Sequence, residues 1–270
     1  MALPDPSPQS TALVTGASSG IGREIARELA RRGYGVTLVA RRRDRLEELA
    51  RELSKEHGVA AHGVGCDLGD ATARDQLATD VDDRGLAVDV LVNCAGFGTY
   101  GDFADTPRER EVEQVRLNVE AVVDLTARFL PAMITRGRGA VINLSSTSGL
   151  QPTPGNADYA ASKSFVLFHS EALHAEVAPA GVTVTAVLPG PVRTEFQEAN
   201  DAEFAEKLPK LVWATAERVA RDAVRAADRG KRSIIPGGFA VRAAFGLNRF
   251  VPKAIVLRVA KRLMAAEADR

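Results

Sequence analysis

The sequence predicts an α/β protein with a doubly wound, parallel seven-stranded sheet and helices on both faces. Short apolar runs alternate with longer segments of helical periodicity, which is the pattern of β-α-β units. The apolar runs are rich in Val, Ile and Leu without polar alternation, so both faces of each strand are expected to be buried. Glycines, which most easily adopt a left-handed terminating conformation, follow the helical runs at Gly33, Gly58, Gly85, Gly137 and Gly181.

Each expected element can be placed along the chain. Strands are predicted at residues 11–15, 35–40, 60–64, 88–92, 140–144, 182–188 and 233–235. Helices are predicted at residues 21–32, 44–57, 71–84, 107–135, 157–178 and 216–229. No internal repeat or interdomain linker interrupts them, so one domain is expected. The predicted organisation is a flexible lead-in over 1–10, a catalytic domain over 11–236 and a C-terminal helical extension of that domain over 237–270.

Composition indicates a soluble globular protein. The 270 residues are 45% hydrophobic and 26% charged, with a net charge of zero, so no field that would attract nucleic acid is expected. Cys66 and Cys94 lie beside apolar strand-like runs and are interpreted as inert core thiols of a cytoplasmic protein. The first ten residues hold three prolines and resemble no secretory signal.

A glycine-rich turn follows the first predicted strand and leads into a helix. It reads Thr15-Gly16-Ala17-Ser18-Ser19-Gly20-Ile21-Gly22, and such a turn lets the backbone and the helix N-terminus approach a pyrophosphate. Its G-x-x-x-G-x-G spacing differs from the general dinucleotide fingerprint. The strand-turn-helix context predicts a Rossmann-type cofactor site formed by Gly16, Ser18, Ser19, Gly20, Ile21 and Gly22.

Arginines end the second predicted strand, where an NAD-preferring site carries an acid. A guanidinium can bind a 2′-phosphate through two hydrogen bonds, so Arg41, with Arg42 as its neighbour, favours NADP over NAD. The alternative is a solvated basic start to the next helix, an interpretation that suits Arg43 best.

Tyr159 and Lys163 are four residues apart on one face of a predicted helix. A tyrosine titrates near pH 10 in water, too high for efficient proton exchange at neutral pH. A positive charge at about 4 Å in an effective dielectric near 20 is worth about 4 kcal/mol, or about three pKa units before opposing desolvation. Lys163 is therefore expected to lower the pKa of Tyr159.

Ser146 lies thirteen residues before Tyr159, directly after the fifth predicted strand. With it, residues 11–235 resemble the short-chain dehydrogenase/reductase family, in its NADP-preferring single-domain branch. The resemblance rests on the glycine-rich turn, Asp67-Leu68, Asn93-Cys94-Ala95-Gly96, Asn118, Ser146, Tyr159 with Lys163, and Pro189-Gly190-Pro191-Val192-Arg193-Thr194.

The resemblance implies a catalytic role for four residues. Tyr159 is expected to be the general acid, and Lys163 to lower its pKa and bind the nicotinamide ribose. Ser146 is expected to stabilise the oxyanion. Asn118 is expected to hold a water against Lys163 and complete a proton path.

The same resemblance implies further cofactor contacts. Asp67, with Leu68, is expected at the adenine, and the turn of Asn93, Ala95 and Gly96 at the adenosine ribose, although Asn93 can equally be structural. Pro189, Gly190, Val192 and Thr194 are expected at the nicotinamide and pyrophosphate. The four histidines offer no metal site.

Substrate identity is less clear in the sequence. Residues 195–214 are expected to form the substrate loop, either as an apolar lid or as a helix packed on the domain, with Phe196, Phe204, Leu208, Leu211 and Trp213 as its apolar residues. Between Arg229 and Ala266 there are nine Lys or Arg residues and no acid. This segment is interpreted as a packed helix pair with a basic face, a peripheral membrane contact, or a dock for an anionic acyl carrier or coenzyme A.

Together these features predict an NADPH-dependent reductase of a hydrophobic ketone or 3-oxoacyl substrate. An NADP-dependent alcohol dehydrogenase working oxidatively is the same chemistry reversed. The alternatives from other classes are a non-catalytic NADPH sensor and a membrane-peripheral protein. Family resemblance also implies a homodimer or homotetramer.

Overall fold

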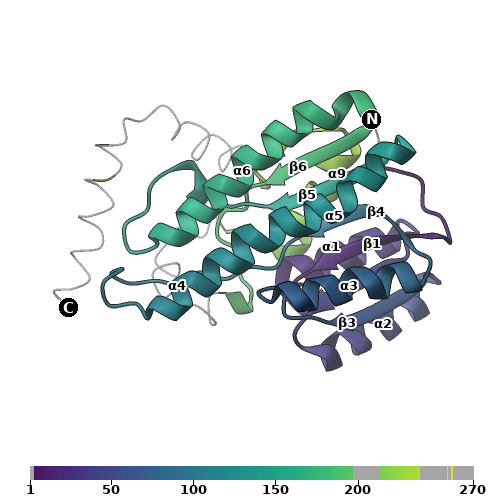
Figure 1. Ribbon diagram of the computed structural model, residues 1–270, viewed down its shortest axis with the longest axis horizontal. Helices are drawn as coiled ribbons and strands as arrows, with labels where there is room; N and C mark the ends of the chain where they lie inside the picture. The colour runs from purple at the N-terminus through teal and green to yellow at the C-terminus, as the bar shows by residue number, and fades with distance from the viewer. Residues whose placement is uncertain (1–2, 197–212, 238–253, 255–256, 258–270) are drawn as a thin grey trace.

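The computed structural model describes residues 3–196, 213–237, 254 and 257 (Figure 1). Its seven strands form one parallel sheet in the order β3-β2-β1-β4-β5-β6-β7. The strands are β1 Ser10–Thr15, β2 Val36–Ala40, β3 Ala61–Gly65, β4 Ala87–Asn93, β5 Gly139–Leu144, β6 Val182–Val187 and β7 Ser233–Ile234. The order reverses between β1 and β4, and open α/β sheets bind ligands at such a switch point. The predicted fold class is confirmed.

Helices cover both faces of the sheet (Figure 1). They are α1 Gly20–Arg31, α2 Arg43–His57, α3 Ala71–Asp83, α4 Arg108–Val115, α5 Ala121–Arg136, α6 Ala157–Val177 and α9 Ala216–Asp228. Short 3-10 turns occur at η2 Thr147–Leu150 and η3 Ala178–Ala180. Most predicted ends differ from these by one residue.

The two faces of the sheet form two hydrophobic cores, as the alternation of side chains along β1 illustrates. Ala12 and Val14 belong to the core beneath α1, α2 and α9. Leu13, between them, belongs to the core beneath α3, α5 and α6. All three side chains are fully buried. The expectation of strands buried on both faces is correct for the five inner strands. It is wrong for β3 and β7, which are only partly buried because they form the edges of the sheet.

The predicted helix over 107–135 is not continuous. A π-helical turn, η1 Arg116–Glu120, separates α4 from α5. Such turns insert an extra residue into the helical ladder and are frequent at functional sites. Asn118 lies in this turn and is fully buried. Hydrophobic periodicity could not reveal the interruption, because helical residues continue on both sides of it.

Two amino-terminal residues, Leu3 and Pro4, form hydrogen bonds with the rest of the domain. Leu3 is buried, and its backbone amide donates a 3.3 Å hydrogen bond to the Asp228 carboxylate. The Tyr34 hydroxyl donates to the Pro4 carbonyl. These contacts fasten Leu3 and Pro4 to the domain, and the flexible lead-in over 1–10 stays a prediction.

The predicted extension over 237–270 lies outside the described residues except at Gly237, Ala254 and Leu257. Within the described ranges, no helix combines the length and the apolar character needed to cross a bilayer.

Candidate active site

The predicted cofactor-site turns meet at the carboxyl ends of β1 and β4. The Thr15 hydroxyl accepts hydrogen bonds from the amides of Cys94 and Ala95, at 2.9 and 3.0 Å, and donates to the Val92 carbonyl at 3.1 Å. A Cβ on Gly16 would lie 3.0 Å from the Ala95 backbone. The glycine-rich turn and the 93–96 turn are thus held against each other.

Glycine is required in the turn at two points. A Cβ on Gly22 would lie 2.4 Å from the Gly16 carbonyl oxygen, closer than non-bonded atoms approach. Gly20 has a φ of +55°, and a Cβ there would lie 3.2 Å from the Thr194 side chain. The turn therefore folds tightly and packs against the segment after β6, as a pyrophosphate site at the sheet edge requires.

Helix α1 begins at this turn without a capping side chain. Its N-cap residue, Ser19, makes no side-chain capping hydrogen bond, and the first turn contains no acid. The Ser18 and Ser19 hydroxyls instead accept hydrogen bonds from Arg42, at 3.0 and 2.8 Å. The amide groups and positive dipole of the α1 N-terminus are thus left to an external anion, so these residues fit a dinucleotide pyrophosphate.

The arginines after β2 are divided between two environments. Arg41 is exposed, whereas Arg42 contacts the glycine-rich turn and also donates a 2.7 Å hydrogen bond to Glu195. Arg45 donates to both oxygens of the same carboxylate, at 2.7 and 2.9 Å. These hydrogen bonds hold the pKa of Glu195 below its usual value. The sequence analysis missed Arg45 and this role of Glu195, although Arg45 belongs to the same basic run and Glu195 directly follows Thr194.

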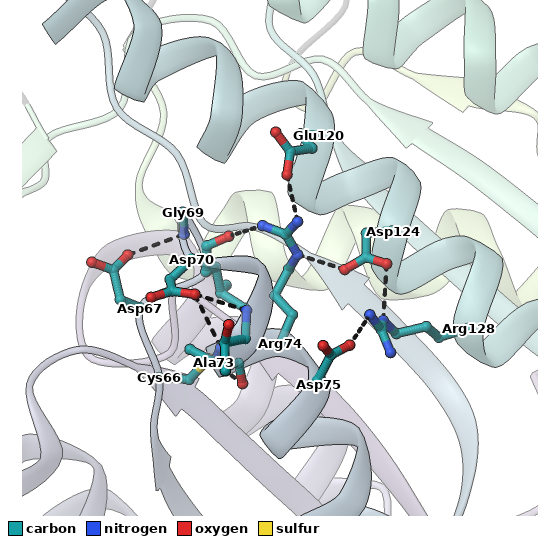
Figure 2. A network of polar contacts seen from close by, with 12 residues as sticks. Cys66, Asp67, Gly69, Asp70, Ala73, Arg74, Asp75, Glu120, Asp124 and Arg128 are labelled. Atoms are coloured by element: carbon teal, nitrogen blue, oxygen red, sulfur yellow. Dashed lines mark hydrogen bonds and ion pairs between the residues drawn. The ribbon is translucent and has the colours of Figure 1, made fainter. Parts of the chain in front are cut away.

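A buried arginine supports the predicted adenine end of the site (Figure 2). Arg74, on α3, donates a 2.7 Å hydrogen bond to the carbonyl of Leu68 and forms ion pairs with Glu120 and Asp124. The Asp67 carboxylate accepts from the Gly69 amide at 3.0 Å, which orders the same loop. Arg74 was also missed, because helical periodicity alone does not reveal a buried cation.

Asn93 has a structural environment. Its side chain is buried and donates to the Asn143 side chain at 2.8 Å and to the Thr126 hydroxyl at 3.2 Å. These contacts join β4 to β5 and α5. The structural interpretation of Asn93 is therefore favoured over a side-chain contact with the cofactor.

Ser146, Tyr159 and Lys163 converge where β5 ends and α6 begins. The Ser146 hydroxyl accepts a 3.1 Å hydrogen bond from the Ser148 amide and lies close enough to the Tyr159 phenol to lower its pKa. The Lys163 ammonium lies 5.6 Å from the centroid of the Tyr159 ring and donates a 2.9 Å hydrogen bond to the Leu144 carbonyl. Tyr159 and Lys163 are both buried. The four-residue spacing of Tyr159 and Lys163 along α6 therefore brings their side chains together.

Asn118 reaches this cluster from the π-helical turn. Its amide donates to the Phe97 carbonyl at 2.8 Å and to the Ser162 hydroxyl at 3.2 Å. A Cβ on Gly96 would lie 2.8 Å from the Asn118 side-chain oxygen and 3.3 Å from the Lys163 ammonium. Gly96 thus lies against both groups, and a side chain at this position would collide with Asn118.

The pKa of Tyr159 differs from the sequence expectation. Burial raises this pKa because the phenolate loses hydration, and nearby Tyr100 raises it further, while nearby Ser146 lowers it. Burial also lowers the pKa of Lys163 to about 8. Desolvation is the largest influence on the Tyr159 pKa, and the expected lowering by Lys163 is not among the contributions to it.

The segment after β6 lies beside the cluster. The Pro189 carbonyl accepts from the Thr147 amide at 3.0 Å, and Val192, two residues beyond Gly190, is buried and bridges to Ala214. The Phe196 ring lies 5.7 Å from the Tyr159 ring between centroids. Of the other apolar residues expected in the substrate loop, Trp213 lies under Arg193, whereas Phe204, Leu208 and Leu211 lie outside the described residues.

The two cysteines have raised pKa values. Burial raises the pKa of Cys66 to about 11 and that of Cys94 to about 12. Both thiols therefore remain protonated at neutral pH, which disfavours a nucleophilic role.

The fold and this cluster define a dinucleotide-dependent oxidoreductase, and comparisons with known proteins give its family. Residues 10–204 match the family described as short chain dehydrogenase. A putative ketoacyl reductase of Streptomyces coelicolor is 37% identical over 217 residues, 80% of this chain and 81% of that protein. The chain therefore belongs to the short-chain dehydrogenase family, and the predicted family and enzyme class are confirmed.

Two further relatives show what this family includes. A very-long-chain 3-oxoacyl-CoA reductase of Anas platyrhynchos is 34% identical over 204 residues, which are 74% of this chain and 65% of that protein. The chain thus spans just under two-thirds of that relative's length. A short-chain dehydrogenase from Sphingobium yanoikuyae in complex with NADPH superposes with a TM-score of 0.80 at 34% identity, covering 88% of this chain and 92% of that one.

Proposed function

We propose that the protein is an NADPH-dependent reductase that acts on the carbonyl of a hydrophobic ketone or 3-oxoacyl substrate. The observation that carries the proposal is the cluster in which the buried Tyr159 ring lies beside the buried Lys163 ammonium, with Ser146 near the phenol. The ketoacyl reductase names of two relatives support the substrate class.

NADPH, when bound, would supply a hydride to the carbonyl carbon. The uncapped α1 N-terminus would hold its pyrophosphate, and Arg42, with Arg41, would bind its 2′-phosphate. The NADPH complex of the Sphingobium relative supports this assignment. The remaining proposed cofactor residues are Gly16, Ser18, Ser19, Gly20, Ile21, Gly22, Asp67, Leu68, Ala95, Gly96, Tyr159, Lys163, Pro189, Gly190, Val192 and Thr194.

Tyr159 would donate its phenolic proton to the carbonyl oxygen as the hydride adds to carbon. The raised pKa keeps that proton on Tyr159 at neutral pH, and an alkoxide is far more basic than a phenolate, so the transfer is favourable. Ser146 would donate a hydrogen bond to the same oxygen and stabilise its developing charge. The products are an alcohol and the Tyr159 phenolate.

Lys163 and Asn118 would complete the proton transfer. The charged ammonium of Lys163 stabilises the neighbouring phenolate, and with a pKa of about 8 it can also exchange a proton near neutral pH. Asn118 and Lys163 both lie against Gly96, and a water held by these two side chains would carry a proton from solvent and return Tyr159 to its starting state.

The surroundings of Tyr159 support an apolar substrate. The Phe196 ring lies close to it, and the partly exposed Tyr100 is near enough to raise the pKa of Tyr159. Aromatic walls contribute binding energy through apolar surface rather than polar contacts. They favour a ketone flanked by hydrocarbon over a sugar.

The proposal is tested by following NADPH consumption with a panel of ketones, 3-oxoacyl thioesters and steroids, with NADH in parallel. We expect turnover with NADPH and little with NADH, and the preferred substrate will define the function. Tight NADPH binding without turnover on a panel that contains all three classes would contradict the reductase assignment and support a cofactor sensor.

We also propose that residues 11–236 form one catalytic domain, extended by 237–270, in a homodimer or homotetramer. The single sheet and its two continuous cores support one domain. For the basic segment 229–266, flotation with anionic vesicles at low and high salt separates a peripheral membrane contact from the other interpretations.

A further inference from the structure

A single carboxylate joins three parts of the proposed cofactor site. Glu195 comes from the segment after β6, Arg42 and Arg45 come from the start of α2, and Ser18 and Ser19 come from the glycine-rich turn. Arg42 donates to both serines and to Glu195, and Arg45 donates to both Glu195 oxygens.

The carboxylate lies where an anion of the cofactor is expected. Two nitrogens of Arg42 donate hydrogen bonds to the glycine-rich turn, which orients this side chain. The third nitrogen, Nη1, donates a 2.7 Å hydrogen bond to Glu195. The pKa of Glu195 is lowered by Arg42 and Arg45, so the group is ionised at neutral pH. Glu195 therefore neutralises part of the charge that a 2′-phosphate would meet.

A 2′-phosphate and a 2′-hydroxyl compete differently for these arginines. A phosphate carries more negative charge and more acceptor oxygens than a carboxylate, so it can replace Glu195 between two guanidinium groups. The ribose 2′-hydroxyl of NADH is neutral and cannot replace the Glu195 carboxylate between the two guanidinium groups. The side chains of Arg42, Arg45 and Glu195 are about 44–48% exposed. Replacement of the carboxylate by a phosphate therefore exchanges solvent-screened ion pairs, and the change in NADPH affinity is modest.

We infer that Glu195 is a specificity-determining residue that acts as an internal counter-ion, pairing with Arg42 and Arg45 until the 2′-phosphate of NADPH displaces it. The inference rests on the proposed function, and it adds Arg45 to the residues that bind the phosphate. Glu195 lowers the affinity for NADPH and leaves the affinity for NADH unchanged.

The exchange also reaches the substrate side. Glu195 follows Thr194, whose side chain packs over Gly20, and precedes Phe196, whose ring faces Tyr159. Release of the carboxylate would free this segment from α2 when the correct cofactor binds. The contact between residues 194–196 and α2 would therefore be released by NADPH and kept with NADH.

The test compares Glu195→Gln with Glu47→Gln, and measures the dissociation constants of NADPH and NADH by cofactor fluorescence. Glutamine keeps the shape of the side chain and removes its charge. Glu47 is a matched control because it also pairs with an arginine of α2, Arg43, at 2.9 Å, outside the proposed site. For two exposed pairs we expect Glu195→Gln to tighten NADPH binding by about threefold to tenfold.

NADH binding is expected to change by less than about twofold in Glu195→Gln, and both cofactors by less than that in Glu47→Gln. Weaker NADPH binding in Glu195→Gln would overturn the inference, because Glu195 would then orient the arginines for the phosphate. An equal effect on both cofactors would overturn it as well. If the unaltered protein binds NADH as tightly as NADPH, the proposed cofactor preference itself fails, and the counter-ion role fails with it.

Discussion

The ammonium of Lys163 donates a 2.9 Å hydrogen bond to the carbonyl of Leu144, the last residue of β5. This bond fastens the first turns of α6 to the sheet edge that Ser146 follows. Because Tyr159 is one turn before Lys163 on α6, the same contact fixes the distance between the phenol and Ser146. The lysine therefore has a structural role in the cluster as well as its proposed role in proton transfer.

Burial of Lys163 should give the protein a distinctive pH dependence. The pKa is 10.5 in the unfolded chain and about 8 in the folded protein, a difference worth about 3 kcal/mol. Below pH 8 both states carry the charge and the folded state bears this cost. Between pH 8 and 10.5 the folded lysine is neutral while the unfolded one is charged, so stability rises with pH.

Urea unfolding over this pH range, compared between the unaltered protein and Lys163→Met, measures the effect. The free energy of unfolding of the unaltered protein should gain about 3 kcal/mol relative to the variant as pH rises from 7.5 to 10.5. Replacement of the exposed Lys55 by Met controls for loss of a lysine. Parallel pH curves for the unaltered protein and Lys163→Met would show that Lys163 is hydrated.

Arg74 should be required for the order of the proposed adenine loop. Arg74→Met leaves the Leu68 carbonyl and the Glu120 carboxylate without this donor, while Asp124 keeps its hydrogen bond from Arg128. We expect a loss of about 2 kcal/mol in the free energy of unfolding. Arg74→Lys should not restore it, because an ammonium cannot make all three contacts in this geometry. Chemical denaturation measures both variants.

Arg128→Met is the matched control for Arg74. Arg128 pairs with Asp124 and Asp75 but does not contact the loop, and its side chain is more exposed. We expect a loss below about 1 kcal/mol and unchanged NADPH affinity. If Arg128→Met and Arg74→Met weaken NADPH binding equally, Arg74 has no specific influence on the loop.

Arg42 should contribute more to NADPH affinity than Arg41. Ser18 and Ser19 already orient Arg42, so less conformational entropy is lost when it binds a phosphate. Arg42→Ala is expected to raise the dissociation constant of NADPH about tenfold, and Arg41→Ala less. Titration with NADPH and NADH measures this, and an equal loss for both cofactors would mean that Arg42 does not bind the 2′-phosphate.

The sequence was sufficient for the parts of the protein that are encoded locally. Val, Ile and Leu runs identified the strands other than β3, whose sequence AHGVG holds a single Val, within about one residue. The spacing of Tyr159 and Lys163 placed both side chains on one helical face. The glycine-rich turn was recognisable because only glycine fits the approach of Gly22 to Gly16. These features depend on neighbouring residues and so are visible in the order of amino acids.

Features that depend on distant contacts were missed. The π-helical turn at Asn118 interrupts a segment that is helical in pattern throughout. Glu195 meets Arg42 across 153 sequence positions, and no local pattern marks either as a partner. Burial raises the pKa of Tyr159, and the sequence does not show how deeply this phenol is buried.

The measurement that tests the account most directly is the turnover of Tyr159→Phe with the best carbonyl substrate and NADPH. The variant removes only the phenolic hydroxyl, and general acid catalysis contributes about 10²–10⁴ in rate. We predict a fall in turnover of at least about a hundredfold at saturating NADPH. Near-normal turnover in this variant would contradict the assignment of Tyr159 as the general acid.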